Sequence, residues 1–260
     1  MPDRIQNTPV LLSALPSHAA HTRVAAALCV LLVAGLLGTL PFAQIAWAPA
    51  PAFILVQESL LSTNDLITAA LLFGQYSISR TPALNRLAGG YLFTALIVIP
   101  HALTFPGTFS APGLLGAGPQ SAAWLYLAWH SVFPFTVAAF ALRRDREEGR
   151  MQGTVAMLSA GLAALGGVVA VTLLVTQGQN WLPPLVENGQ FTTDARVAVG
   201  MLLVLPLAAL VLLIGRRPRS ILDLWLMVVM FAWFCTICLG AFVTSGRLTP
   251  DGTSAVLLTG

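Results

Sequence analysis

Two carboxylates and two histidines stand out because the sequence around them is almost entirely apolar. Glu58 and Asp65 are seven residues apart, so a helix places both on one face, about 10 Å apart along its axis. His101 and His130 lie within residues 87–142, a stretch without Asp, Glu, Lys or Arg. A carboxylate beside an imidazole stabilises the charged form of both groups and fixes the orientation of the ring. We expect these four side chains to face a common cavity that binds a ligand or a proton.

Three interpretations of the histidines remain open. Each could hydrogen-bond a neighbouring helix and hold a bundle together, both could belong to a ligand- or proton-sensing pocket, or both could ligate a metal or haem. A bis-histidine haem needs two imidazoles at the same level across the iron. Depth estimates place His101 nearer the end of its helix than His130, which disfavours haem bound through His101 and His130. The cofactor therefore stays unassigned, and no metal site is predicted.

Aromatic and amide side chains near these residues complete the predicted site. Tyr126 and Trp129 lie deep enough in their segment to line a pocket, and Asn64 adjoins Asp65. The predicted ligand- or signal-binding residues are Glu58, Asn64, Asp65, His101, Tyr126, Trp129 and His130. No Ser/His/Asp set and no run of metal-ligating residues occurs at a usable spacing. We therefore do not expect an enzyme, and no catalytic residue is assigned.

The elements that must position this site are expected to span a membrane. The 260 residues are 57% hydrophobic and 9% charged, and the mean hydropathy is +0.81. A soluble domain carries about 25% charged residues, so this composition cannot cover a water-facing surface. A formal net charge of +3 is too small for nucleic-acid binding. Because lipid offers no partners to free backbone groups, the predicted fold class is an all-α, polytopic transmembrane helical bundle.

Seven segments are long and apolar enough to cross the hydrocarbon core, which takes about 20 residues of helix. They are residues 24–42, 52–78, 84–104, 121–142, 153–176, 197–214 and 224–243. Eleven of the thirteen arginines fall on one side of these spans, and only Arg196 and Arg247 fall on the other. Positively charged loops stay in the cytoplasm, so we expect about seven spans with the N-terminus cytoplasmic.

Depth along these spans groups the ionisable residues at two levels. The second and fourth spans run inward and the third runs outward, which places Glu58 with His101 near the outer side and Asp65 with His130 closer to the middle. We expect their cavity to open to the outside. The uncharged loop 105–120 is rich in Pro and Gly. It could fold back as a lid over this mouth or serve as a plain tight connector.

Three stretches resemble the MASE4 domain, a membrane-associated sensor module of bacteria that precedes histidine kinase or diguanylate cyclase domains. They are NDLITAALLFGQYSISR at 64–80, GGYLFTALIVIPHALTFPGTFSAPGLLGAG at 89–118 and WLYLAWHSVFP at 124–134. The resemblance falls on Asn64, Asp65, Pro100, His101, Phe105, Pro106, Trp124, Tyr126, Trp129 and His130. It is strongest over residues 64–142 and extends more loosely from the first span to the seventh. It implies a helical bundle that passes a signal to a cytoplasmic output domain.

The chain departs from the family pattern after its seventh span. Members of the family continue through a Gly-Arg-aromatic segment into an eighth helix and the output domain. Here Gly246 and Arg247 are followed by LTPDGTSAVLLTG. We therefore expect a truncated or split sensor with a cytoplasmic segment at residues 1–23, a transmembrane sensor domain at 24–243 and a short external tail at 244–260.

The favoured function is a signal-input module in the membrane without its own output domain. The partners expected are membrane lipid, a small-molecule signal from the outer side, and a separate signalling protein or a second copy of the chain; nucleic acid is not expected. One alternative is a small transporter that uses the four ionisable residues as a proton relay, which would need a polar path into the cytoplasmic half. The other is a haem-binding membrane protein.

Overall fold

The structure, a computed structural model, describes residues 15–42, 51–110, 113–142, 153–187, 190–216 and 220–245. Its helices are α1 (Ala19–Thr39), α2 (Pro51–Ser79), α3 (Pro82–Thr104), α4 (Ser121–Leu142), α5 (Gly153–Thr176), α6 (Thr193–Gly215) and α7 (Ile221–Ser245). Two 3-10 turns, η1 (Leu40–Phe42) and η2 (Gln179–Trp181), and an antiparallel pair of short strands, β1 (Val186–Glu187) and β2 (Gln190–Phe191), complete the described elements. Each predicted span coincides with one helix to within a few residues, and the all-α bundle is confirmed.

Six helices of the described part are long and apolar enough to cross a membrane. The seventh, α2, has 29 residues, which is ample length for a span at 1.5 Å per residue. Polar side chains, including Glu58, Asn64 and Asp65, lower its hydropathy. Because α2 packs closely along α3, it lies at the same depth as the apolar helices, and the bundle has about seven spans.

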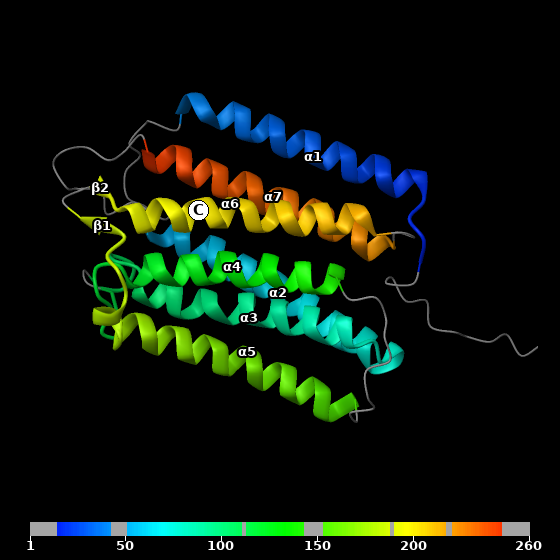
Figure 1. Cartoon of the computed structure of the whole chain (residues 1–260), viewed down its shortest axis with the longest axis horizontal. Helices are drawn as coiled ribbons and strands as arrows, with labels where there is room; N and C mark the ends of the chain where they lie inside the picture. The colour runs from blue at the N-terminus through cyan, green and yellow to red at the C-terminus, as the bar shows by residue number, and fades with distance from the viewer. Residues whose placement is uncertain are drawn as a thin grey trace, which may run out of the picture.

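The bundle is built around α3, which packs against α2, α4 and α5. From α4 the packing continues through α6 and α7 to α1, and Figure 1 shows α5 and α1 at opposite margins of the molecule. The core between the helices is filled by side chains such as Leu87, Ile97, Leu125, Val137 and Met230, all fully buried. In contrast, α1 contacts α7 along one side and is otherwise exposed.

Successive helices run in opposite directions, so their connections gather at two ends of the bundle (Figure 1). One end, here called the arginine end, holds the start of α1 and the connection between α2 and α3, with Arg23, Arg80 and Arg86. The other, here called the loop end, holds residues 105–110, 113–120, 177–187 and 190–192. The predicted arginine-rich loop 143–152, residues 217–219 and the tail from 246 onward lie outside the described residues.

The loop that follows α3 folds back onto the end of that helix. The Leu114 amide donates to the Leu103 carbonyl at 2.8 Å. Gly113 has a φ of +84° and lies so close to the Thr104 carbonyl that a Cβ there would collide with it, which explains the glycine. The described residues of this loop therefore return to the end of α3, and the choice between a lid and a plain connector stays a prediction.

Candidate functional site

A buried carboxyl–imidazole pair, here called the ion pair, joins α2 to α3 near the loop end. The Nδ1–H of His101 donates to Glu58 Oε1 across 2.6 Å. Both residues are buried, with exposed fractions of 6% for Glu58 and 2% for His101. One turn farther along α2, the Ser62 hydroxyl donates to the Ala95 carbonyl of α3 at 2.7 Å. The two antiparallel helices thus hold the predicted Glu58–His101 contact in register.

Three polar atoms around this pair have no hydrogen-bond partner among the described residues. They are Glu58 Oε2, His101 Nε2 and Trp129 Nε1, and all are buried. Nearly all buried polar atoms in proteins are hydrogen-bonded, so such atoms require an explanation such as a water, an ion or a ligand. Glu58 Oε2 is a hydrogen-bond acceptor and Trp129 Nε1 is a donor. His101 Nε2 accepts a hydrogen bond when the ring is neutral and donates one when the ring is charged. This combination can bind a proton or a small polar molecule.

Aromatic rings enclose the imidazole of His101. The ring centroids of Phe105, Tyr126 and Trp129 lie 5.9, 6.5 and 6.0 Å from that of His101. Phe105 comes from the loop that folds back over α3 and is itself buried. The expected cavity open to the outside is therefore wrong in one respect, because the described residues cover the pair instead of leaving it at an open mouth.

His130 occupies a different environment from the one predicted. Its Nδ1–H donates to the Tyr126 carbonyl at 3.0 Å, and its ring stacks on the Tyr126 ring with centroids 3.8 Å apart. Trp129 and Trp233 lie 4.7 and 5.1 Å from it, centroid to centroid. The ring is therefore held by aromatic neighbours of α4 and α7.

The predicted pairing of Asp65 with His130 is not found. The Asp65 carboxyl lies beside the Thr94 hydroxyl and close to Tyr91, both on α3. Depth along the bilayer follows from residue number, but the direction of a side chain around its helix axis depends on packing. Asp65 faces α3 as Glu58 does, whereas His130 is turned toward α7.

Asn64 does not join the site. Its side chain is exposed on the surface of α2, one residue away from the face that carries Glu58 and Asp65. Of the seven predicted site residues, the structure brings together Glu58, His101, Tyr126, Trp129 and His130 as one contiguous group, and it leaves Asn64 and Asp65 outside it. No group of three or more His, Cys, Asp or Glu residues suited to a metal ion occurs in the described part of the chain.

Trp233 of α7 belongs to this group and was missed from the sequence. Its Nε1–H donates to the His130 carbonyl at 3.4 Å, and its ring lies 6.2 Å from that of Trp129. Pro134 follows His130 by four residues and has no N–H, so the His130 carbonyl lacks its helical donor. A proline four residues after a buried histidine was the available signal that another helix must supply a donor here.

The group forms a continuous series of contacts through the bundle. It begins at Glu58 on α2, passes through His101 on α3 and Trp129 on α4, and ends at Trp233 on α7. A change in charge or hydrogen bonding at the ion pair can therefore alter packing at α7 through direct contacts alone.

A family model matches most of the chain. The family model MASE4, described as "Membrane-associated sensor, integral membrane domain", matches residues 48–248. That range covers α2 to α7 and the whole contact series, while α1 precedes it. No curated protein and no solved structure matches the chain.

Proposed function

The chain belongs to the MASE4 family of membrane-associated sensor domains, and from this premise we propose that its signal acts at the Glu58–His101 pair. The protein is then a non-catalytic input module of a bacterial inner membrane. Its output passes from the start of α7, which lies at the arginine end (Figure 1), to a separate cytoplasmic signalling protein, such as a histidine kinase or a diguanylate cyclase. The observation that carries this proposal is the buried ion pair with unpartnered polar atoms beside it.

The chemistry of the pair suits a sensor. When its Nδ1–H is bound to Glu58, the His101 ring presents Nε2 as an acceptor if neutral and as a donor if charged. A proton, or a small polar molecule that hydrogen-bonds to Nε2, therefore changes the charge balance of a water-poor site. Placing an ionisable group within a membrane costs free energy, and such groups mark functional sites in membrane proteins.

The response is expected to reach α7 through the aromatic contacts. Trp129 touches both the His101 ring and Trp233, which also donates to the His130 carbonyl. Packed rings rarely shift alone, because protein interiors are close-packed. A repositioned His101 would thus displace Trp129 and alter the seating of α7 on α4.

Proton conduction, the alternative function, receives less support. A relay along α2 would have to continue from Asp65 toward Tyr76 at the arginine end. The interface between them is filled by Ala69 and Leu72, whose exposed fractions are 1% and 3%. Neither side chain can carry a proton, so the polar groups of α2 are interrupted there.

The contact series is tested by fluorine NMR. The full chain is labelled with 5-fluorotryptophan in lipid nanodiscs, and Trp129→Phe and Trp233→Phe assign the two resonances. Glu58→Gln removes the charge but keeps the shape of the side chain. We expect it to shift the resonances of both tryptophans, because the ion pair and the ring contacts are coupled.

Two controls accompany this measurement. Asp65→Asn neutralises the other carboxyl of α2 outside the contact series, so the Trp233 resonance should stay in place. Trp181 is 84% exposed and belongs to η2, outside the contact series, and its resonance should not move in any variant. The proposal fails if Glu58→Gln and His101→Gln both fold and neither moves the Trp233 resonance.

A further inference from the structure

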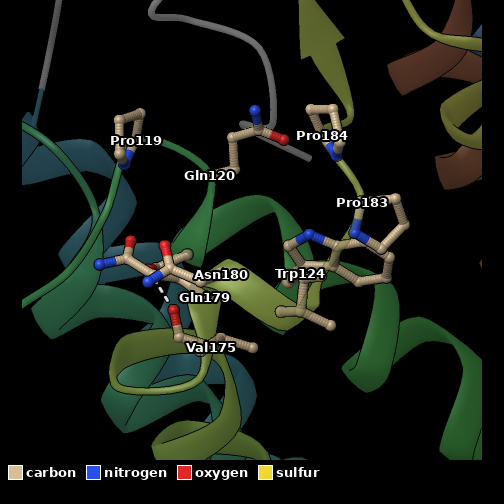
Figure 2. Close-up of a pocket in the computed structure, with 10 residues that line it drawn as sticks. Pro119, Gln120, Trp124, Val175, Gln179, Asn180, Pro183 and Pro184 are labelled. Carbon is tan, nitrogen blue, oxygen red and sulfur yellow. Dashed lines mark hydrogen bonds between the residues drawn. The ribbon is translucent and has the colours of Figure 1, made fainter.

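A cavity lies at the loop end, between the start of α4, the end of α5 and residues 179–184; it is called the second cavity here to distinguish it from the predicted cavity at the Glu58–His101 pair. Its volume is about 280 Å³, and Figure 2 shows the side chains that line it. The lining includes Trp124 and the carboxamides of Gln179 and Asn180, with prolines around them. This cavity is separate from the Glu58–His101 pair, whose residues do not line it.

The walls of this cavity are held in place by hydrogen bonds between elements. The Ser121 hydroxyl of α4 donates to the Val175 carbonyl of α5 at 2.6 Å. Gln120 binds the opposite wall twice, because Nε2 donates to the Val186 carbonyl at 3.3 Å and Oε1 accepts from the Leu185 amide. Pro119, Pro183 and Pro184 further restrict the backbone. A binding site formed in this way needs little ordering when a ligand enters.

The chemistry of the lining is polar but uncharged. None of its ten residues is Asp, Glu, His or Arg. Gln179 and Asn180 are exposed, and their carboxamides make no hydrogen bond with any residue that the structure describes. Each carboxamide offers both donors and an acceptor. In Figure 2 the two carboxamides lie together, and the indole of Trp124 lies beside Pro183.

We propose that this cavity binds one uncharged, hydroxylated ring, as found in a hexose or in the glycosyl headgroup of a lipid. Hydroxyl groups both donate and accept, so they match the two carboxamides, while the C–H face of the ring packs on the Trp124 indole. A carboxylate or phosphate would find no opposite charge in the lining. The volume lies just below the range for drug-sized ligand sites, about 300–1,000 Å³, which suits a single ring.

Binding is measured by saturation-transfer NMR on the full chain in phosphatidylcholine nanodiscs. The probes are glucose, galactose, mannose and N-acetylglucosamine, with glucuronate and glucose 6-phosphate as charged analogues and sorbitol as an open-chain polyol. We expect at least one of the four neutral sugars to bind and the charged and open-chain compounds not to bind. Asn180→Ala and Gln179→Ala should each weaken binding about fivefold, the ratio expected for one lost hydrogen bond.

Gln177→Ala is the matched control. Gln177 is exposed on the same segment but does not line the cavity, so its variant should bind as the wild type does. A second arm places monoglucosyl diacylglycerol in the nanodisc and follows hydrogen exchange of residues 177–187. Protection in this arm together with no binding of free sugar identifies a lipid headgroup as the source of the ring.

The proposal is overturned if neither arm detects a neutral ring, if charged analogues bind equally well, or if the Asn180 and Gln179 variants bind with wild-type affinity. These outcomes are independent of the contact series, because none of Glu58, His101, Trp129 and Trp233 lines the cavity. A failure here would not affect the fluorine measurement on Trp233, and a failure there would not affect sugar binding.

Discussion

At the scale of single residues, Glu58 and His101 show how a polar pair is tolerated among apolar helices. His101 Nδ1 and Glu58 Oε1 are hydrogen-bonded to each other at 2.6 Å. The other two polar atoms of the pair, Glu58 Oε2 and His101 Nε2, are available to a water molecule or a ligand. Removing one partner of such a pair leaves the other buried without a hydrogen-bond partner. The resulting loss in the free energy of unfolding is larger than the net contribution of the intact pair.

The stability of the folded chain should therefore depend on what replaces Glu58. We expect Glu58→Leu to lower the free energy of unfolding by about 1–3 kcal/mol, because His101 is then left without an acceptor. Glu58→Gln retains an acceptor oxygen and should cost less. Reversible unfolding in bicelles, followed by helical circular dichroism, measures both changes. Equal losses in the two variants would contradict a role for the hydrogen bond.

Asn64→Leu provides the opposite case on the same helix. The Asn64 side chain is exposed on α2 and lies outside the site. Placing an amide against lipid costs free energy. We expect the free energy of unfolding of this variant to equal or exceed that of the wild type. If it is lower, the difference should be no more than about 0.5 kcal/mol. A loss comparable to that of Glu58→Leu would show that Asn64 has a packing partner, such as a second copy of the chain.

Residue spacing accounts for the part of the site that could be predicted. The contact of Glu58 with His101 follows from two antiparallel helices joined by a short turn, because position along one helix then fixes position along the other. The orientation of His130 could not be obtained in this way. Residue number gives depth, but rotation about α4 is set by the packing of Tyr126, Trp129 and Trp233.

At the scale of the elements, prolines decide where one helix can bind the backbone of another. Pro134 leaves the His130 carbonyl of α4 without a helical donor, and Trp233 of α7 supplies one at 3.4 Å. Within a membrane such a carbonyl needs a partner from the protein, since lipid provides none. The proline and the tryptophan should therefore be energetically coupled.

A double-mutant cycle tests this coupling. Trp233→Phe keeps most of the ring but removes the donor, and we expect it to lower the free energy of unfolding by about 1 kcal/mol. In a Pro134→Ala background the alanine N–H can bind the His130 carbonyl, so the same substitution should cost less. Trp225→Phe on the same helix, where Trp225 is 39% exposed, should cost equally in both backgrounds. A cycle without a difference for Trp233 would exclude the coupling.

The helices themselves were predictable because hydropathy and length are nearly sufficient to identify the segments of a chain that cross a membrane. The expected span 121–142 coincides with α4, and 153–176 coincides with α5. The boundaries differ most for α6 and α1, where polar residues such as Thr193 and Thr22 continue the helix beyond the apolar core. Lateral arrangement was not predictable, because an apolar side chain can face lipid or protein with similar ease.

At the scale of the whole molecule, α1 stands apart from the unit that carries the site. Its main packing against the long helices is on α7, and the family match begins after it, at residue 48. The contact series and the second cavity both lie within α2 to α7 and the connections between them. The position of α1 beside α7 places it next to the helix through which we expect the signal to leave.

The direction in which a signal crosses the molecule depends on which end faces the cytoplasm. Arg23, Arg80 and Arg86 lie at the arginine end, whereas the second cavity lies at the loop end. His101 is three residues from the end of α3, about 5 Å at 1.5 Å per residue. With the arginine end in the cytoplasm, the ion pair therefore lies nearer to the outer surface than to the cytoplasmic one.

Labelling of single cysteines decides this orientation. In a background in which Cys29, Cys235 and Cys238 are replaced by Ser, we expect Gln177→Cys at the loop end to react with a membrane-impermeant maleimide in intact spheroplasts. Ala19→Cys, at the start of α1, should react only after the membrane is permeabilised, because the positively charged end is retained inside. Both positions are exposed in the fold, so burial cannot explain a difference between them. The reverse pattern would place the ion pair near the cytoplasmic surface and make an external signal untenable.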